Sequence, residues 1–363
     1  MTEEKINDRG KSIDEIKKER LGTTGGQALI EGVMMTGPKG TAMAVRHVIS
    51  HKIKVKKIEN KRFRDSHKIG RVPFIRGIIN FVESMILGYK TLMDSAELSG
   101  SMESDVPEEE MSKADKWIDE HFGPKMITVI SIISSILGFA IAFFLFMYLP
   151  SKIVTLADNH LFSQVLAHHN LKPLFEGIIR IVIFVAYIAL VGQMKDMKRV
   201  FQYHGAEHKT IFCYESGEEL TVENVRKQKR FHPRCGTNFI FIVLLISILC
   251  SSLLAVIIRQ FPWGMNFIEN NAIGWVLVKI LIIPIVVGIS YEYIMYAGHH
   301  ENIFTKIVSA PGLALQRITT KEPDDSMIEC GIASMKAAVY NEYPDDETGE
   351  EDKCHDEKIN AQE

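Results

Sequence analysis

The chain of 363 residues predicts a mainly α-helical, polytopic membrane protein with about four transmembrane helices and a small cytosolic α+β portion. Two observations lead to this fold class. Hydrophobic residues make up 46% of the sequence, and they gather in long runs, of which 126–149 and 238–258 can each cross a hydrocarbon core about 30 Å thick. Outside these runs lie glycine-punctuated, charged and amphipathic segments, which are typical of a cytosolic portion.

The N-terminal part predicts a small β unit followed by an amphipathic helix. Residues 1–24 are polar and of mixed charge, so we expect them to be disordered. Residues 25–72 form a glycine-rich unit in which apolar side chains alternate with polar ones. Three strands are expected there: 25–38, 41–50 and 53–58. Residues 73–98 cluster apolar side chains on one side of a helix, which we expect to lie on the inner membrane surface.

An acidic linker at 99–125 leads into four expected transmembrane spans. These spans are 126–149, 177–194, 238–258 and 272–297. The first and third contain no charged residue, whereas the second contains Arg180 and the fourth contains Lys279 and Glu292. Charged residues inside a bilayer are costly, so an alternative remains in which the second and fourth segments are buried helices of a soluble core.

Lysine and arginine are distributed unequally among the segments that connect the spans. The segment 195–237 is rich in both, whereas the connections at 150–173 and 259–271 contain few. Because positively charged loops stay on the cytoplasmic side, 195–237 and both termini are expected in the cytoplasm. The C-terminal part then comprises a cytosolic helical region, 298–341, and an acidic disordered tail, 342–363. Within the helical region, Asp324 or Asp325 is expected to cap a helix that runs to about Asn341. The expected location is the bacterial inner membrane, crossed several times.

The segment 195–237 contains an H-x-x-E-H motif formed by His204, Glu207 and His208. On a helix these residues fall on one face, so two imidazoles can hold a divalent metal ion with the carboxylate beside its open side. His232 and Cys235 follow just before the third span and are further ligands of the kind that zinc prefers. We therefore predict a divalent metal ion, zinc as the first choice, bound by these two residues together with His204 and His208.

Two carboxylates outside the motif are candidates for an additional role at this site. Glu292 lies near the inner end of the fourth expected span, level with the motif, and its alternative role is an interfacial carboxylate paired with a nearby Tyr or Lys. Glu31 lies in an apolar, glycine-flanked strand, and its alternative role is a salt bridge near a turn.

Four long motifs in this order resemble the YqhQ-like family of bacterial membrane proteins. They are GGQALIEGVMMTGP, YHGAEHKTIFCYE, RFHPRCGTNF and LQRITTKEPDDSMIECGIASM, which together span the chain from about Gly25 to Val339. The resemblance implies a membrane protein of unknown function. Members of this family are sometimes labelled predicted metal-dependent enzymes. The histidines and the glutamate of the H-x-x-E-H motif favour the same interpretation.

Two classes of function fit these residues. In the first, the protein is a metal-dependent hydrolase at the cytoplasmic membrane face, and Glu207 is the general base that takes a proton from water. In the second, the four ligands saturate a structural site, or form a polar cluster without metal, in a membrane scaffold, assembly factor or transporter accessory. A solvent-filled cleft beside Glu207 is expected only for the hydrolase.

The composition and charge distribution indicate which partners the protein is expected to have. Membrane lipid is an expected partner, and a membrane protein or a lipid-linked molecule is the expected substrate of the hydrolase. The net charge of −3 conceals a basic stretch at 39–76 and an acidic tail from Asp345 onward. This distribution argues against a nucleic acid partner.

Overall fold

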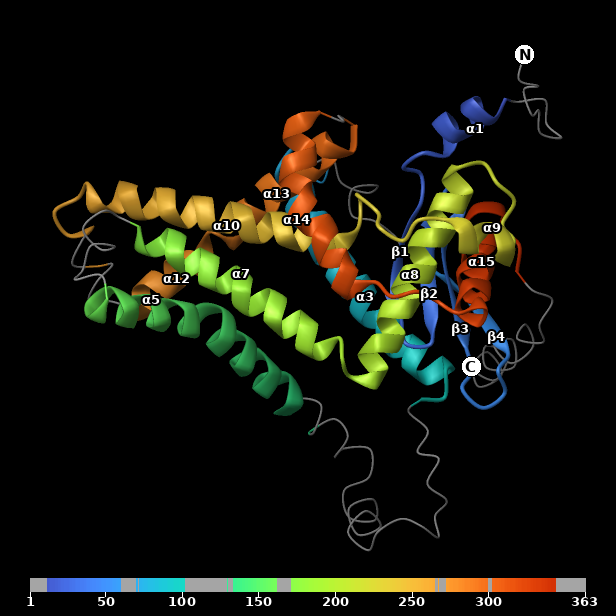
Figure 1. Ribbon diagram of the computed structural model, residues 1–363, viewed down its shortest axis with the longest axis horizontal. Coiled ribbons are helices and arrows are strands. Elements are labelled where there is room, and N and C mark those ends of the chain that lie inside the picture. The colour runs from blue at the N-terminus through green and yellow to red at the C-terminus, as the bar shows by residue number, and fades with distance from the viewer. Residues whose placement is uncertain are drawn as a thin grey trace, which may run out of the picture.

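The computed structural model describes most of the chain outside the termini and five connecting segments. The described residues are 12–59, 72–101, 133–161, 171–264, 272–299 and 302–343, with single positions 70, 129 and 267. Residues 1–11 of the expected N-terminal disorder, most of the expected acidic tail and most of the expected acidic linker lie outside the described residues. Disorder was expected as far as residue 24, and this is wrong for Ile13–Arg20, which form a helix, α1, capped by Ser12. Figure 1 shows a bundle of long helices at one end of the molecule and a compact α+β part at the other.

Among the described residues, three helices are long and apolar enough to cross a membrane, judged by length and composition. They are Ile133–His160, α7 (Lys172–Val191) and α10 (Gly236–Arg259). The first runs past its expected end at residue 149, through a π-helical turn, η2 (Phe144–Tyr148), into α5 (Leu149–His160). These helices fit the expected class of a polytopic, mainly helical membrane protein.

The fourth expected span is not one continuous helix. It is divided into α12 (Ala272–Leu281) and α13 (Ile283–His299), so neither piece has the length of the other three helices. Pro284 lies at this break, and its missing N–H and its ring disfavour an uninterrupted helix through the preceding turn. The apolar run in the sequence was correctly recognised, but its continuity was not.

The β unit is a four-stranded antiparallel meander in which sequential strands are neighbours. Its strands are β1 (Gly25–Leu29), β2 (Gly32–Gly37), β3 (Gly40–Arg46) and β4 (Ile53–Ile58). The expectation of one strand at 25–38 is wrong, because the chain reverses at Ile30 and Glu31, where Glu31 has a left-handed φ of 51°. Gly32 allows β3 to lie close to the start of β2, since an added Cβ would lie 2.4 Å from the Ala44 carbonyl oxygen.

Helices cover both faces of the sheet and thereby fix the position of the H-x-x-E-H motif. One face packs Val33 and Met35 against α8 (Lys195–Glu215) and α15 (Asp325–Tyr340). The other face, with Met34 and Met43 among its buried residues, packs against α3 (Ile75–Leu98), the helix expected at 73–98. The motif helix α8 is therefore held against β1, β2 and α15 in the compact part of the molecule (Figure 1).

Smaller helices complete the α+β part. They are α1 (Ile13–Arg20) and α9 (Val222–Lys227), whereas α14 (Ile303–Thr319) packs against α10 and α7 of the bundle. The expected cap of the last helix is confirmed: the Asp324 carboxylate accepts a hydrogen bond of 3.0 Å from the Met327 N–H, and the helix ends at Tyr340.

Candidate metal centre

The H-x-x-E-H motif lies in the middle of α8, so both histidines leave the same side of one rigid helix. The imidazole centroids of His204 and His208 are 4.4 Å apart, as expected for side chains four residues apart on a helix. Cys235 approaches them from the start of α10, where it is the N-terminal capping residue. The site therefore joins the motif helix to the first turn of an apolar helix long enough to span a membrane.

His204 is held by both of its ring nitrogens. Nδ1 lies 2.9 Å from the carbonyl oxygen of Thr319, which can only accept, so the proton is assigned to Nδ1. Nε2 then presents its lone pair, and it lies 3.1 Å from the Cys235 sulfur. A backbone carbonyl therefore fixes both the tautomer and the direction of this imidazole.

His208 repeats the arrangement on the same side of the helix. Its Nδ1 is hydrogen-bonded to the carbonyl oxygen of Arg230 at 2.5 Å, which again leaves the lone pair on Nε2. This side chain is only 1% exposed, and within the described chain Nε2 has no hydrogen-bond partner. A buried, unsatisfied nitrogen is uncommon in folded proteins and indicates a missing partner.

The side chains of His204, His208 and Cys235 bring their potential ligand atoms close together. One nitrogen from each of His204 and His208 and the sulfur of Cys235 all lie within 4.8 Å of one another. Metal-binding histidines commonly donate their second ring N–H to a backbone carbonyl, as both do here. Two imidazoles and a thiolate form a donor set that suits zinc, with a small closure needed to reach bond lengths of ~2.0–2.3 Å.

A cysteine nucleophile paired with a histidine base would also bring His204 to Cys235. That pair needs one imidazole, whereas here a second one, from His208, points its free nitrogen at the same place. The dyad leaves this buried nitrogen unexplained, and a metal ion accounts for all three atoms.

His232 was expected as a fourth ligand, but the structure orients its ring nitrogens elsewhere. The rings of His208 and His232 are 5.6 Å apart, yet Nδ1 of His232 accepts a hydrogen bond of 3.3 Å from the Arg234 N–H. Its Nε2 lies 3.9 Å from the Glu215 carboxylate, beyond hydrogen-bonding distance, and, like Nε2 of His208, it is buried without a hydrogen-bond partner among the described residues. Burial lowers the pKa of His232, an effect that Glu215 opposes. His232 therefore lies beside the cluster without joining it.

Glu207, the expected general base, occupies the space between α8 and the sheet. A helix advances about 100° per residue, so the side chain of Glu207 diverges from that of His208. An added Cβ at Gly26 of β1 would lie 2.7 Å from Glu207 Cγ, which shows how closely the strand approaches. Burial raises the pKa of Glu207 to about 7, while His204 and the Ala28 N–H act in the opposite direction.

This pKa gives a prediction for the metal-free protein. Because the folded-state pKa of Glu207 is raised from 4.5, its contribution to stability is complete below about pH 4.5 and is lost as pH rises through about 7. The loss is at most roughly 3 kcal/mol by linkage. Thermal denaturation in detergent with a chelator, from pH 5 to 8, should show a steeper fall for the wild type than for Glu207→Gln. Melting temperatures that fall equally with pH in the wild type and in Glu207→Gln would contradict a raised pKa of Glu207.

Glu31 and Glu292, the two additional candidates, both lie in salt bridges outside the cluster. Glu31, in the turn between β1 and β2, binds Arg199 through two bonds of 2.5 Å and accepts a third from the Tyr203 hydroxyl. Glu292 on α13 binds Arg76 of α3 at 2.8 and 2.5 Å. For Glu31 this matches the alternative role proposed above, whereas the partner of Glu292 is an arginine and not the expected Tyr or Lys.

Several residues that support the site were not recognised in the sequence. Gln316 of α14 is fully buried, accepts a hydrogen bond from the His232 N–H at 2.8 Å and donates one to the His232 carbonyl at 2.7 Å. Thr319 and Arg230 act through carbonyl oxygens, which any residue type can supply. The motif around Gln316 was noted in the sequence, but nothing in it indicated the distant partner.

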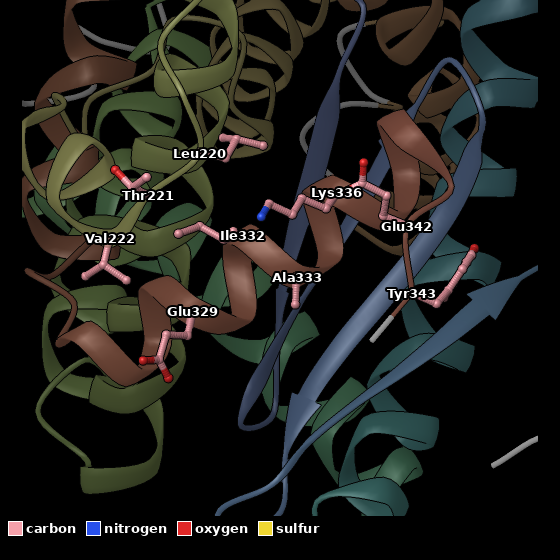
Figure 2. Close-up of a pocket in the computed structure, with 9 residues that line it drawn as sticks. All are labelled: Leu220, Thr221, Val222, Glu329, Ile332, Ala333, Lys336, Glu342 and Tyr343. Atoms are coloured by element: carbon pink, nitrogen blue, oxygen red, sulfur yellow. The ribbon is translucent and has the colours of Figure 1, made fainter. Parts of the chain in front are cut away.

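A groove of about 480 Å³ lies at a different place, between the start of α9 and α15 (Figure 2). Its lining includes Leu220, Val222, Ile332 and Lys336. None of the three clustered ligands and neither Glu207 nor His232 lines this groove, so it is not the cleft expected beside the general base.

Comparison with known proteins places the chain in a family. The family that matches residues 72–341 is described as a protein of unknown function (DUF1385). The chain belongs to this family. It is 32% identical over 314 residues to the uncharacterized protein YqhQ of Bacillus subtilis strain 168, covering 86% of this chain and 90% of that protein. The resemblance stated from the sequence is thereby confirmed. No solved structure matches.

Proposed function

We propose that this protein is a membrane-anchored, metal-dependent hydrolase whose metal centre consists of His204, His208 and Cys235. The proposal rests on two observations: Nε2 of His208 is buried without a hydrogen-bond partner among the described residues, and one ring nitrogen of each histidine lies with the Cys235 sulfur within 4.8 Å of one another. Zinc sites with three protein ligands keep a fourth position for water or substrate, which is the arrangement of catalytic sites.

Glu207 supports the catalytic role over a merely structural one. It lies in the same turn of α8 as both histidines, with its carboxylate toward β1 and close enough to His204 for an electrostatic interaction. A pKa of about 7 suits a group that must accept a proton near neutral pH. A bound divalent ion would acidify a water in the fourth position, and Glu207 would take its proton.

The location of the centre suggests where the substrate is found. Cys235 caps the apolar helix α10, so the ligands lie at the junction of the bundle and the α+β part. The basic residues of α8, α9 and the following segment favour the cytoplasmic side. A substrate in or attached to the membrane, such as a lipid-linked molecule or a membrane protein, fits this position.

A structural metal centre is the second candidate, and one observation favours it. The carboxylate of Glu207 interacts with the Ala28 N–H of β1 and is buried, so it is already partnered in this conformation. In that case the metal would join α8 to α10, and the protein would be a membrane scaffold or an accessory subunit.

Metal analysis of the detergent-purified full chain tests the centre. We expect about one zinc per wild-type chain, and a loss to below about a tenth in His204→Ala, His208→Ala and Cys235→Ala. His232→Ala is the matched control, because His232 is not among the three residues whose ligand atoms lie together, and it should keep the metal.

Two results would contradict the assignment. Absence of metal from the wild type would contradict the metal centre. Faster alkylation of Cys235 than of the other cysteines would then favour a cysteine–histidine pair. Equal loss of metal from His232→Ala and from the three ligand variants, at equal thermal stability, would restore the four-ligand site expected from the sequence.

A further inference from the structure

A second cluster of charged residues lies in the helical bundle, away from the metal centre. Four charged side chains are buried there, each no more than 9% exposed: Asp158, Glu176, Arg180 and Lys279. They come from α5, α7 and α12, which lie together at one end of the molecule (Figure 1). Buried charges among apolar helices are costly and usually have a function.

Both buried carboxylates of this cluster are in ion pairs with lysines. Asp158 lies 3.4 Å from the ammonium of Lys172, and Glu176 lies 2.7 Å from that of Lys279. Ser151 donates a further hydrogen bond of 2.9 Å to Glu176. Each of these pairs is neutral overall, which leaves Arg180 as the cation in the cluster that has no carboxylate at contact distance among the described residues.

The contact of Arg180 is with a backbone carbonyl, and the sequence explains why that carbonyl is available. Pro150 has no N–H to donate to the carbonyl of Phe146, four residues earlier, and the helix widens there into a π-turn. Nε of Arg180 supplies the missing donor at 2.8 Å. This bond fixes the guanidinium and leaves its two terminal NH₂ groups without an acceptor in the part of the chain that the structure describes.

We propose that the two terminal NH₂ groups of Arg180 bind the phosphate group of an anionic lipid. A guanidinium presents parallel donors that match the oxygens of a phosphate, and an anion would neutralise the remaining positive charge of the cluster. Arg180 lies eight residues into α7, about 12 Å from its start at 1.5 Å per residue. The neighbouring Ile178 and Val182 expose 46% and 58% of their surface, so acyl chains would cover the helix beside it.

The test uses the full chain purified in a maltoside detergent, whose headgroup has neither charge nor phosphate. The probes are phosphatidylglycerol, diacylglycerol with the same acyl chains, and inorganic phosphate. Binding is measured by native mass spectrometry and by the change in melting temperature. We expect the wild type to bind phosphatidylglycerol and to be stabilised by it by several degrees, with no comparable effect of diacylglycerol.

Three variants make the result specific. Arg180→Gln keeps a donor for the Phe146 carbonyl but removes the charge, and it should weaken phosphatidylglycerol binding about tenfold or more. Lys152→Gln removes an exposed cation from α5 and should bind as the wild type does. If Arg180→Gln does not fold, Arg180→Lys retains the charge without the paired donors and should still bind phosphatidylglycerol more weakly than the wild type.

The outcomes separate the sources of the ligand. Stabilisation by phosphatidylglycerol alone supports the lipid headgroup, and equal stabilisation by inorganic phosphate would overturn the lipid assignment in favour of a free anion. Wild-type affinity for phosphatidylglycerol in both Arg180 variants, or equal effects of phosphatidylglycerol and diacylglycerol on the wild type, would overturn the site itself.

Discussion

Glu207→Gln should keep the fold and the metal but abolish function in cells. The amide preserves the shape of the carboxylate and can still accept a hydrogen bond from Ala28, so the packing between α8 and β1 should be retained. It cannot accept a proton, and loss of a general base costs about 10²- to 10⁴-fold in rate. The measurement is complementation of a deletion strain, with protein level and zinc content determined in the same cells.

The comparison variant is His208→Ala, which should lose both metal and function. If the centre is structural, Glu207→Gln should complement the deletion nearly as well as the wild type, whereas His208→Ala should lower the amount of protein through lost folding energy. Full complementation by Glu207→Gln at equal abundance would therefore exclude the hydrolase and leave the structural centre. The two variants have to be compared, because His208→Ala is expected to lose function whether the centre is catalytic or structural.

The sequence was sufficient for the features that depend on local patterns. Apolar runs identified the three long helices, and four-residue spacing placed His204 and His208 on one side of a helix. Asp324 was recognised as a helix cap because its partner is three residues away. In each case the interacting groups are close in sequence, so their separation along the chain determines their separation in space.

The features that were missed depend on contacts between distant segments. The turn at Glu31 has no Asn-Gly or Asp-Gly signal, and its left-handed residue is held by Arg199, which is 168 residues away. The orientation of His232 is determined by Gln316 and Glu215, neither of which a ligand-spacing rule includes. Residue type alone predicted His232 as a ligand, and tertiary packing turned its nitrogens elsewhere.

Gly205→Ala should destabilise the protein and reduce its metal content, because the segment that follows α14 lies directly against α8 at this glycine. An added Cβ at Gly205 would lie 2.0 Å from the carbonyl oxygen of Lys321. That segment is held to α8 by a hydrogen bond of 2.8 Å from the Lys321 N–H to the Phe201 carbonyl. Overpacking of this kind costs about 1–3 kcal/mol or more, and backbone cannot move aside as a flexible side chain can.

The same displacement should reach the metal centre, since Thr319, two residues before Lys321, holds the ring of His204. Gly236→Ala is the matched control: this glycine directly follows the ligand Cys235, and an added Cβ would meet nothing within 4 Å. It should leave both the melting temperature and the zinc content unchanged or slightly raised, because alanine favours the first turn of α10. Equal melting temperatures and zinc contents for the two alanine variants would show that the approach of Lys321 to α8 does not position His204.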